Sequence, residues 1–159
     1  LSFAFYKNSY IGRTFIKPTQ EERESSVHLK LSVLESVVKD KRIVLVDDSI
    51  VRGTTIANLI HMLKEAGAKE VHVRISSPPF LHPCYFGTDV PSNDQLIAAS
   101  HSTEEICKMI GADSLGYMQT DYLEGMAGGL PLCKACFDGN YPMEIPDYTN
   151  AEFADIVKC

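Results

Sequence analysis

The sequence predicts an α/β fold in which a parallel sheet is flanked by helices. The run from Ile43 to Val46 is apolar and rich in β-branched residues, which indicates a strand buried on both faces. Apolar residues then recur at helical spacing from about Thr54 to Ala66, and they alternate with polar residues over 71–75. A strand, a helix and a strand in this order form a right-handed crossover between parallel strands.

Shorter elements are expected on both sides of this unit. Residues 1–6 resemble the end of an apolar element, and apolar residues alternate over 27–33, as in a strand with one buried face. Ser102 and Glu105 have the spacing of a capping box, which predicts a helix that begins there and stops at Gly111. The remaining expected elements are a helical turn over 34–38, a helix over 92–99, a strand over 114–118 and a helix over 121–126.

Length and composition describe a globular domain. The 159 residues are 45% hydrophobic, and the net charge of −6 without a basic run argues against nucleic acid as a partner. No apolar run has the length of a membrane span and no signal peptide begins the chain, so we expect a cytoplasmic protein without a membrane partner. Because the first residue is Leu1 and not Met, we expect a piece of a longer protein, truncated at its N-terminus.

Two adjacent carboxylates end the central strand. Asp47 and Asp48 lie at the edge where open α/β sheets bind ligands, and residues 52–55 then turn the chain into a helix. Such a turn offers unpaired N–H groups to a phosphate, and Gly53 lets the backbone come close. Since two acids would repel the phosphate itself, their expected partners are neutral hydroxyl groups or a divalent cation. A phosphorylated sugar satisfies both requirements.

The stretch from Val44 to Thr55 resembles the signature of the type I phosphoribosyltransferases. Together with the stretch from Lys7 to Ile16, it is similar to one family among them, the glutamine phosphoribosylpyrophosphate amidotransferases. The resemblance implies a phosphoribosyltransferase-like parallel sheet and a reaction in which ammonia from glutamine displaces pyrophosphate. The product would be 5-phosphoribosylamine, the first committed intermediate of purine nucleotide synthesis. A buried strand with an acidic helix cap in an unrelated α/β domain is the alternative.

The same resemblance assigns roles to individual residues. Asp47 and Asp48 would hold the ribose 2′- and 3′-hydroxyls and the shell of a magnesium ion, and the turn would hold the 5′-phosphate. Substrate binding is therefore expected at Asp47, Asp48, Ser49, Val51, Arg52, Gly53, Thr54 and Thr55.

A mobile loop over residues 7–19 is also expected from the resemblance. Its cations Lys7 and Arg13 would neutralise the leaving pyrophosphate, and closure of the loop would exclude water. In the family this loop helps to complete a passage for ammonia. An ordinary solvated loop is the alternative.

Cysteine spacing points to a metal site. Cys133 and Cys136 form a C-x-x-C pair, which suits one metal or iron–sulfur cluster, with zinc or free thiols as alternatives. The resemblance implies a 4Fe–4S cluster held by Cys84, Cys133, Cys136 and a fourth cysteine upstream of this sequence. We expect that cluster in the intact protein and not in this piece alone. Cys107 and Cys159 are expected to be bystanders.

These expectations divide the chain into a phosphoribosyltransferase domain over 1–127 and a Cys-containing segment over 128–159. The expected cofactors are Mg²⁺ and the cluster. The expected partners are phosphoribosyl pyrophosphate, a glutaminase domain of the same chain and further copies of it, and the piece alone should be inactive. Two other classes of protein share the acidic motif. A base-specific phosphoribosyltransferase would lack the Lys7–Ile16 loop and the C-x-x-C pair. A non-catalytic sensor of phosphoribosyl pyrophosphate would usually add a DNA-binding segment.

Overall fold

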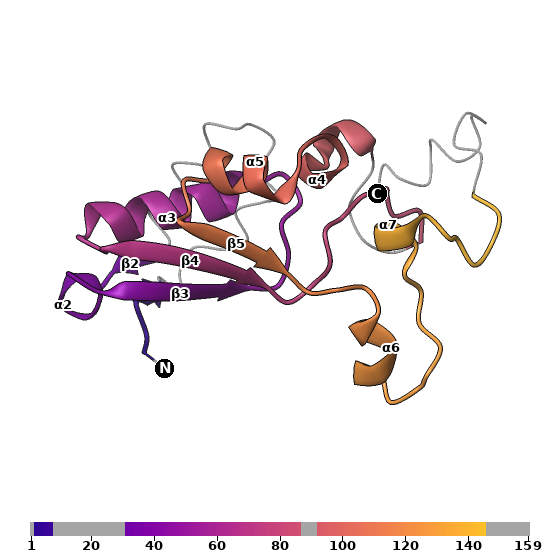
Figure 1. Ribbon diagram of the computed structural model, residues 1–159, viewed down its shortest axis with the longest axis horizontal. Coiled ribbons are helices and arrows are strands. Elements are labelled where there is room, and N and C mark those ends of the chain that lie inside the picture. The colour runs from indigo at the N-terminus through magenta and orange to yellow at the C-terminus, as the bar shows by residue number, and fades with distance from the viewer. Residues whose placement is uncertain (1, 8–30, 87–91, 146–159) are drawn as a thin grey trace.

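A parallel sheet with helices on one face is the main feature of the computed structural model, which describes residues 2–7, 31–86 and 92–145 (Figure 1). Strand β4 (Glu70–Ile75) lies between β3 (Arg42–Asp47) and β5 (Ser114–Tyr117), and both neighbours run parallel to it. Helix α3 (Thr54–Glu65) connects β3 to β4. The predicted strand–helix–strand unit is therefore confirmed.

The remaining elements are short. Strands β1 (Phe5–Lys7) and β2 (Leu31–Val33) pair antiparallel in a separate two-stranded sheet. The other helices are α2 (Glu35–Val38), the 3₁₀ helix η1 (Asn93–Gln95), α4 (Ile97–Ser100), α5 (Thr103–Met109), α6 (Tyr122–Met126) and α7 (Ala135–Asp138). The expected helix over 92–99 is thus divided into η1 and α4, whereas the expected turn over 34–38, the strand over 114–118 and the helix over 121–126 are confirmed.

Helix α5 begins at the predicted capping box. The Ser102 hydroxyl accepts a hydrogen bond from the Glu105 N–H at 3.3 Å, and the Glu105 carboxylate accepts one from the Ser102 N–H at 2.8 Å. These hydrogen bonds favour the charged form of Glu105 and lower its pKa. Gly111 follows the helix with φ of +73°, a conformation that glycine adopts without strain.

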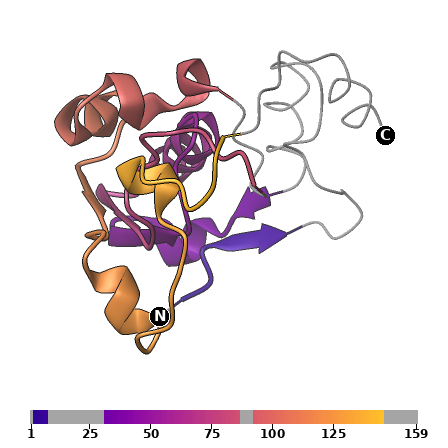
Figure 2. The same ribbon diagram turned by 90° about the vertical axis from the view of Figure 1, so that its right-hand side faces the viewer.

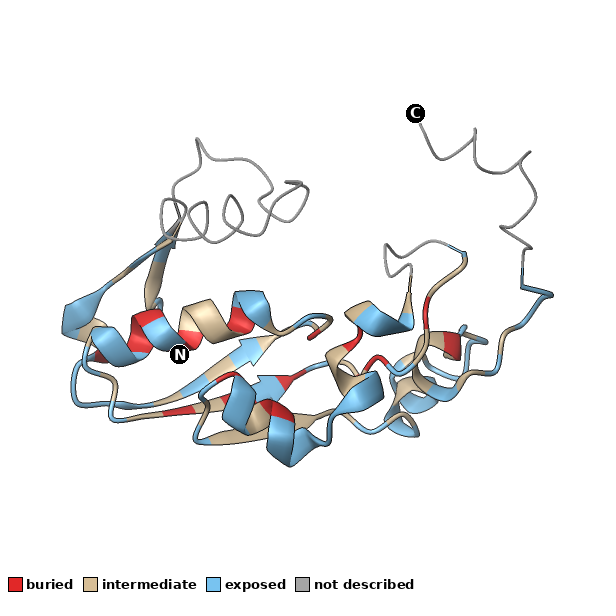
Figure 3. Ribbon diagram, turned by 90° about the horizontal axis from the view of Figure 1, so that it is seen from above, coloured by how far each residue is buried: buried red, intermediate tan, exposed pale blue. Residues whose placement is uncertain are grey.

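The core lies between the sheet and the helices α3 and α5. Figure 3 shows buried positions on α3, β4 and α5 that alternate with intermediate and exposed ones. On β4 the buried side chains are every second residue, as the predicted alternation requires. The buried residues of this hydrophobic core are Val38, Ile50, Ile56, Ile60, Leu63, Val71, Val73, Ile75, Ile106 and Ile110.

The opposite face of the sheet corrects the expectation of a strand buried on both faces. Val44 and Val46 are 62% and 67% exposed. The reason is that β3 is an edge strand of the described sheet, and the described helices cover only the face that carries Ile43 and Leu45. The prediction of burial on both faces, made from the apolar run alone, was therefore wrong for this strand.

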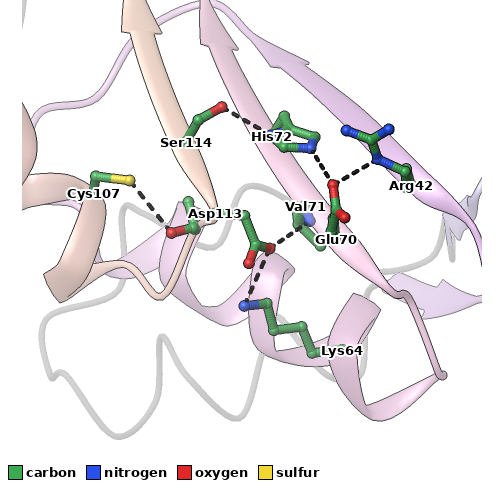
Figure 4. A network of polar contacts seen from close by, with 9 residues as sticks. Arg42, Lys64, Glu70, Val71, His72, Cys107, Asp113 and Ser114 are labelled. Atoms are coloured by element: carbon green, nitrogen blue, oxygen red, sulfur yellow. Dashed lines mark hydrogen bonds and ion pairs between the residues drawn. The ribbon is translucent and has the colours of Figure 1, made fainter.

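Polar side chains of β4 and its neighbours occupy the same uncovered face (Figure 4). The Glu70 carboxylate bonds to Arg42 Nε at 2.6 Å and to His72 Nε2 at 2.9 Å, and His72 Nδ1 lies 2.9 Å from Ser114 Oγ. The hydrogen bonds to His72 and Arg42 lower the pKa of Glu70. His72 therefore has a structural role away from the C-terminal edge of the sheet.

A second, smaller cluster lies beyond the C-terminal ends of the strands. Phe80 and Leu96 are buried, and their partly buried neighbours are Val51, Cys84, Cys136 and Phe137. The rings of Phe80 and Phe137 are 5.1 Å apart. Figure 2 looks along the strands from this end and shows α6 and α7 in front of the sheet. Within the described residues, none of the helices is long and apolar enough to span a bilayer.

Candidate functional site

The acidic pair lies at the C-terminal end of β3, as predicted. Asp47 is the last residue of the strand and is half-buried, whereas Asp48 is exposed. Asp47 Oδ1 accepts a hydrogen bond from the Asp48 N–H at 3.0 Å, and Ser49 Oγ donates one to Asp48 Oδ1 at 3.0 Å. Burial raises the pKa of Asp47, and the neighbouring charge of Asp48 adds to the effect. The Asp47 carboxylate would therefore gain from a cation or from hydroxyl donors.

The loop after β4 supports this strand end. The Ser76 N–H donates to the Asp47 carbonyl oxygen at 3.0 Å, and Ser76 Oγ lies 3.3 Å from the same oxygen and 3.5 Å from that of Asp48. This contact places the start of the 76–79 segment at the same edge of the sheet as the acidic pair. The backbone that carries both carboxylates is thus held by its neighbouring strand.

The turn between β3 and α3 leaves the start of the helix open to an anion. Gly53 adopts φ of +83° immediately before Thr54, and no side-chain cap hydrogen bond is found at this helix start within the described residues. Helix geometry leaves the first N–H groups of α3 without intrahelical partners, and these groups carry the positive end of the helix dipole. The exposed hydroxyl side chains of Thr54 and Thr55 lie at the same place. A turn with the geometry to bind an anion therefore lies next to two carboxylates.

Replacing Gly53 with Ala tests the geometry of this turn. A non-glycine residue at φ of +83° is strained, and an added Cβ would lie 3.0 Å from Ile97 Cδ1. We expect the free energy of unfolding to fall by about 1–2 kcal/mol, measured by chemical denaturation. The control is Gly125→Ala in α6, because nothing lies within 4 Å of an added Cβ there. Equal stability of the two variants would contradict the strained turn.

Arg52 contacts a residue that the sequence did not indicate. Its Nε donates to Gln95 Oε1 at 3.1 Å, and its Nη2 donates to the same oxygen. The two residues are 43 positions apart, and no local pattern links them. Arg52, predicted to bind substrate, is thus directed toward η1.

No sequence motif indicated that Tyr117 lies at this edge of the sheet. The strand register places it in the same row as Ile75 and Asp47, on the covered face of the sheet. Its hydroxyl is buried with no hydrogen-bond partner among the described residues, and burial raises the pKa of Tyr117 to about 12. The expected strand over 114–118 was the one available signal, because its last residues had to lie at the ligand-binding edge.

Two of the three predicted cluster cysteines lie side by side, with the third close by. Burial raises the pKa of Cys136 to about 11, and the next contributions are the charge of Cys84 and a hydrogen bond with it, with a smaller one from Cys133. The carbonyl oxygen of Cys136 accepts hydrogen bonds from the N–H groups of Leu81 and His82, which fixes α7 against the loop after β4.

The described residues bring these cysteines near one another but do not form a complete metal site. Across residues 2–7, 31–86 and 92–145, no three or more His, Cys, Asp or Glu side chains are arranged to hold a metal ion. Cys107 lies elsewhere, with its Sγ 3.3 Å from the Ala112 carbonyl oxygen, and Cys159 is outside the described residues.

The loop predicted over 7–19 is described only at its first residue. Lys7 ends β1, where its backbone pairs with Leu31. Arg13 and the other residues of this segment lie outside the described residues. The assignment of Lys7 and Arg13 to catalysis stays a prediction.

Comparisons with known proteins converge on one group. The profile of the family described as phosphoribosyl transferase domain matches residues 5–76. The amidophosphoribosyltransferase of Bacillus subtilis is 52% identical over 148 residues, and that of Pyrococcus horikoshii is 59% identical over 136 residues. These matches cover 87% and 86% of this chain but 30% of each relative. The chain thus spans about a third of the length of these relatives.

A solved structure agrees with these sequences. The glutamine phosphoribosylpyrophosphate amidotransferase of Bacillus subtilis, complexed with ADP and GMP, superimposes with a TM-score of 0.77 at 50% sequence identity. The superposition covers 92% of this chain and 34% of that one.

Proposed function

Because residues 5–76 of this chain match the phosphoribosyl transferase domain family, we propose that the chain is the part of an amidophosphoribosyltransferase that binds phosphoribosyl pyrophosphate and transfers its 5-phosphoribosyl group to ammonia. The product is 5-phosphoribosylamine, and a glutaminase part outside this chain supplies the ammonia. The observation that carries the proposal is the proximity of a carboxylate pair and an uncapped helix-opening turn at one edge of a parallel sheet. Identity of 50% or more, extending far beyond the acidic motif, favours this enzyme over a base-specific transferase.

In this proposal Asp47 and Asp48 bind the sugar end of the substrate. Carboxylates accept hydrogen bonds from the 2′- and 3′-hydroxyls, and one or two carboxylates with substrate phosphates are the usual magnesium ligands in proteins. The raised pKa of Asp47 supports the assignment, because a desolvated carboxylate that has no ion pair among the described residues is stabilised by such partners.

The turn over residues 51–55 binds the 5′-phosphate at the other end of the sugar. The N–H groups that open α3 donate to the phosphate oxygens, and the hydroxyls of Thr54 and Thr55 add donors. With both ends fixed, ammonia attacks the anomeric carbon as the bond to pyrophosphate breaks, and pyrophosphate leaves with the bonding electrons. The attached nitrogen then loses one proton to solvent to give the amine. Such a reaction depends mainly on positioning and on electrostatic stabilisation. Lys7 and Arg13 of the 7–19 loop are proposed to neutralise the leaving group.

A 4Fe–4S cluster in the intact protein belongs to the same proposal. Cys84 and Cys136 already contact each other, and Cys133 lies close enough to affect the Cys136 thiol. Thiolates are the usual ligands of such clusters, and the fourth would come from outside this chain. When bound, the cluster would act as a structural clamp that ties the segment over 128–159 to the domain over 1–127. We also propose that the intact enzyme is cytoplasmic and oligomeric.

An assay of pyrophosphate release tests the proposed reaction. We expect the intact protein to release pyrophosphate from phosphoribosyl pyrophosphate when ammonium and Mg²⁺ are present, and to stop when the metal is chelated. Adenine, hypoxanthine and uracil serve as control acceptors and should give no release. Release that depends on a nucleobase, or substrate binding without turnover, would contradict the proposal.

A further inference from the structure

Residues 95–97 hold the phosphate-binding turn from outside. The Ile97 N–H donates to the Val51 carbonyl oxygen at 2.9 Å. The Ile97 side chain lies against Gly53, at the place where any Cβ on that glycine would point. Leu96, which is 1% exposed, packs in the same small cluster as Val51. Residues 95–97 therefore contact the turn both through a backbone hydrogen bond and through apolar side chains.

The side chain of Gln95 completes these contacts. Its Oε1 accepts hydrogen bonds from both Nε and Nη2 of Arg52, so that one acceptor fixes the plane of the guanidinium group. None of the ion pairs found among the described residues involves Arg52. Gln95 is thus the described residue that orients the Arg52 side chain.

The turn needs such support because it has little structure of its own. Residues 48–53 belong to neither β3 nor α3, and Gly53 is in the left-handed region. A phosphate binds tightly only when the N–H groups are already oriented, since ordering them at the moment of binding costs conformational entropy. The contacts with residues 95–97 supply that order before the substrate arrives.

We propose that Gln95 is a positioning residue for substrate binding, which acts through Arg52 to hold the 51–55 turn in its phosphate-binding conformation. This inference rests on the proposed function and adds a residue remote in sequence from the acidic motif. Its effect is on the affinity for the phosphorylated sugar. The attack of ammonia involves atoms at the other end of the substrate.

Steady-state kinetics of the intact enzyme test this role with three variants. Gln95→Met keeps the length of the side chain but removes the acceptor, so KM for phosphoribosyl pyrophosphate should rise about tenfold. The kcat value and KM for ammonia should stay within about twofold, because only the phosphate end is disturbed. Gln95→Glu restores an acceptor and should return KM to within about twofold of the wild type. Asn93→Ala, an exposed amide in the same 3₁₀ helix, is the control and should change nothing.

A double-mutant cycle separates action through Arg52 from general loosening. In an Arg52→Met background, Gln95→Met should have no further effect on KM. An unchanged KM in Gln95→Met, no rescue by Gln95→Glu, or an equal rise of KM in both backgrounds would overturn the inference. If those results occur while the Asp47→Asn/Asp48→Asn enzyme is inactive, only the role of Gln95 fails. If that double variant keeps full turnover, the proposed function fails and this inference fails with it.

Discussion

Replacing both Asp47 and Asp48 with Asn is expected to lower kcat/KM for phosphoribosyl pyrophosphate by about a thousandfold or more in the intact enzyme. Asn keeps the size of each side chain but removes its negative charge. That charge holds magnesium and makes the hydrogen bonds from the ribose hydroxyls stronger. Pyrophosphate release at low substrate concentration measures the effect. Values within about tenfold of the wild type would show that the carboxylates do not hold the sugar.

The same substitution should not destabilise the fold. Burial raises the pKa of Asp47, so its charge is unfavourable in the folded state, and a neutral amide relieves that cost. Loss of activity with equal or higher stability is typical of functional groups held in an unfavourable environment. Asp113→Asn is the matched control at the opposite edge of the sheet. There the carboxylate accepts from the Val71 N–H at 2.7 Å, a bond that Asn can also make, and kcat/KM should not change.

Cys133→Ser is expected to abolish the visible absorption of the intact enzyme purified without oxygen. The wild type should absorb broadly near the blue if a 4Fe–4S cluster is bound, and the cluster needs each of its thiolate ligands. Cys133 is exposed, so the substitution removes a ligand without disturbing the core. Absorption spectra with iron determination provide the measurement.

Cys107→Ser is the control for this experiment. Cys107 lies on α5, where its thiol bonds to the Ala112 carbonyl oxygen, and Ser can make the same bond. This variant should keep the colour of the wild type. A colourless wild-type protein, or colour that survives in Cys133→Ser, would contradict the assignment of the cysteines.

Local patterns predicted the part of the fold that depends on neighbours in sequence. The order β3, α3, β4 and the capping box of Ser102 are local, and the structure confirms them. Burial of Val44 and Val46 was overestimated, because an apolar run does not reveal which strand is an edge or what covers its second face. That information depends on packing across the whole sheet.

The candidate site shows the same division. The acidic pair and the turn are contiguous in sequence, so one motif identified both. Gln95 and Tyr117 reach this edge of the sheet from distant segments, through a side-chain contact and a strand register that no spacing encodes. The approach of Cys84 to Cys136 likewise depends on how α7 packs against the loop after β4.

Calorimetric titration of phosphoribosyl pyrophosphate into the intact protein, with and without Mg²⁺, tests most directly whether the acidic pair and the turn bind opposite ends of one ribose 5-phosphate. The wild type should bind more tightly with the metal. In Asp47→Asn/Asp48→Asn the metal dependence should disappear, with only weak binding through the phosphate turn remaining. Equal affinity and equal metal dependence in the two proteins would contradict the account.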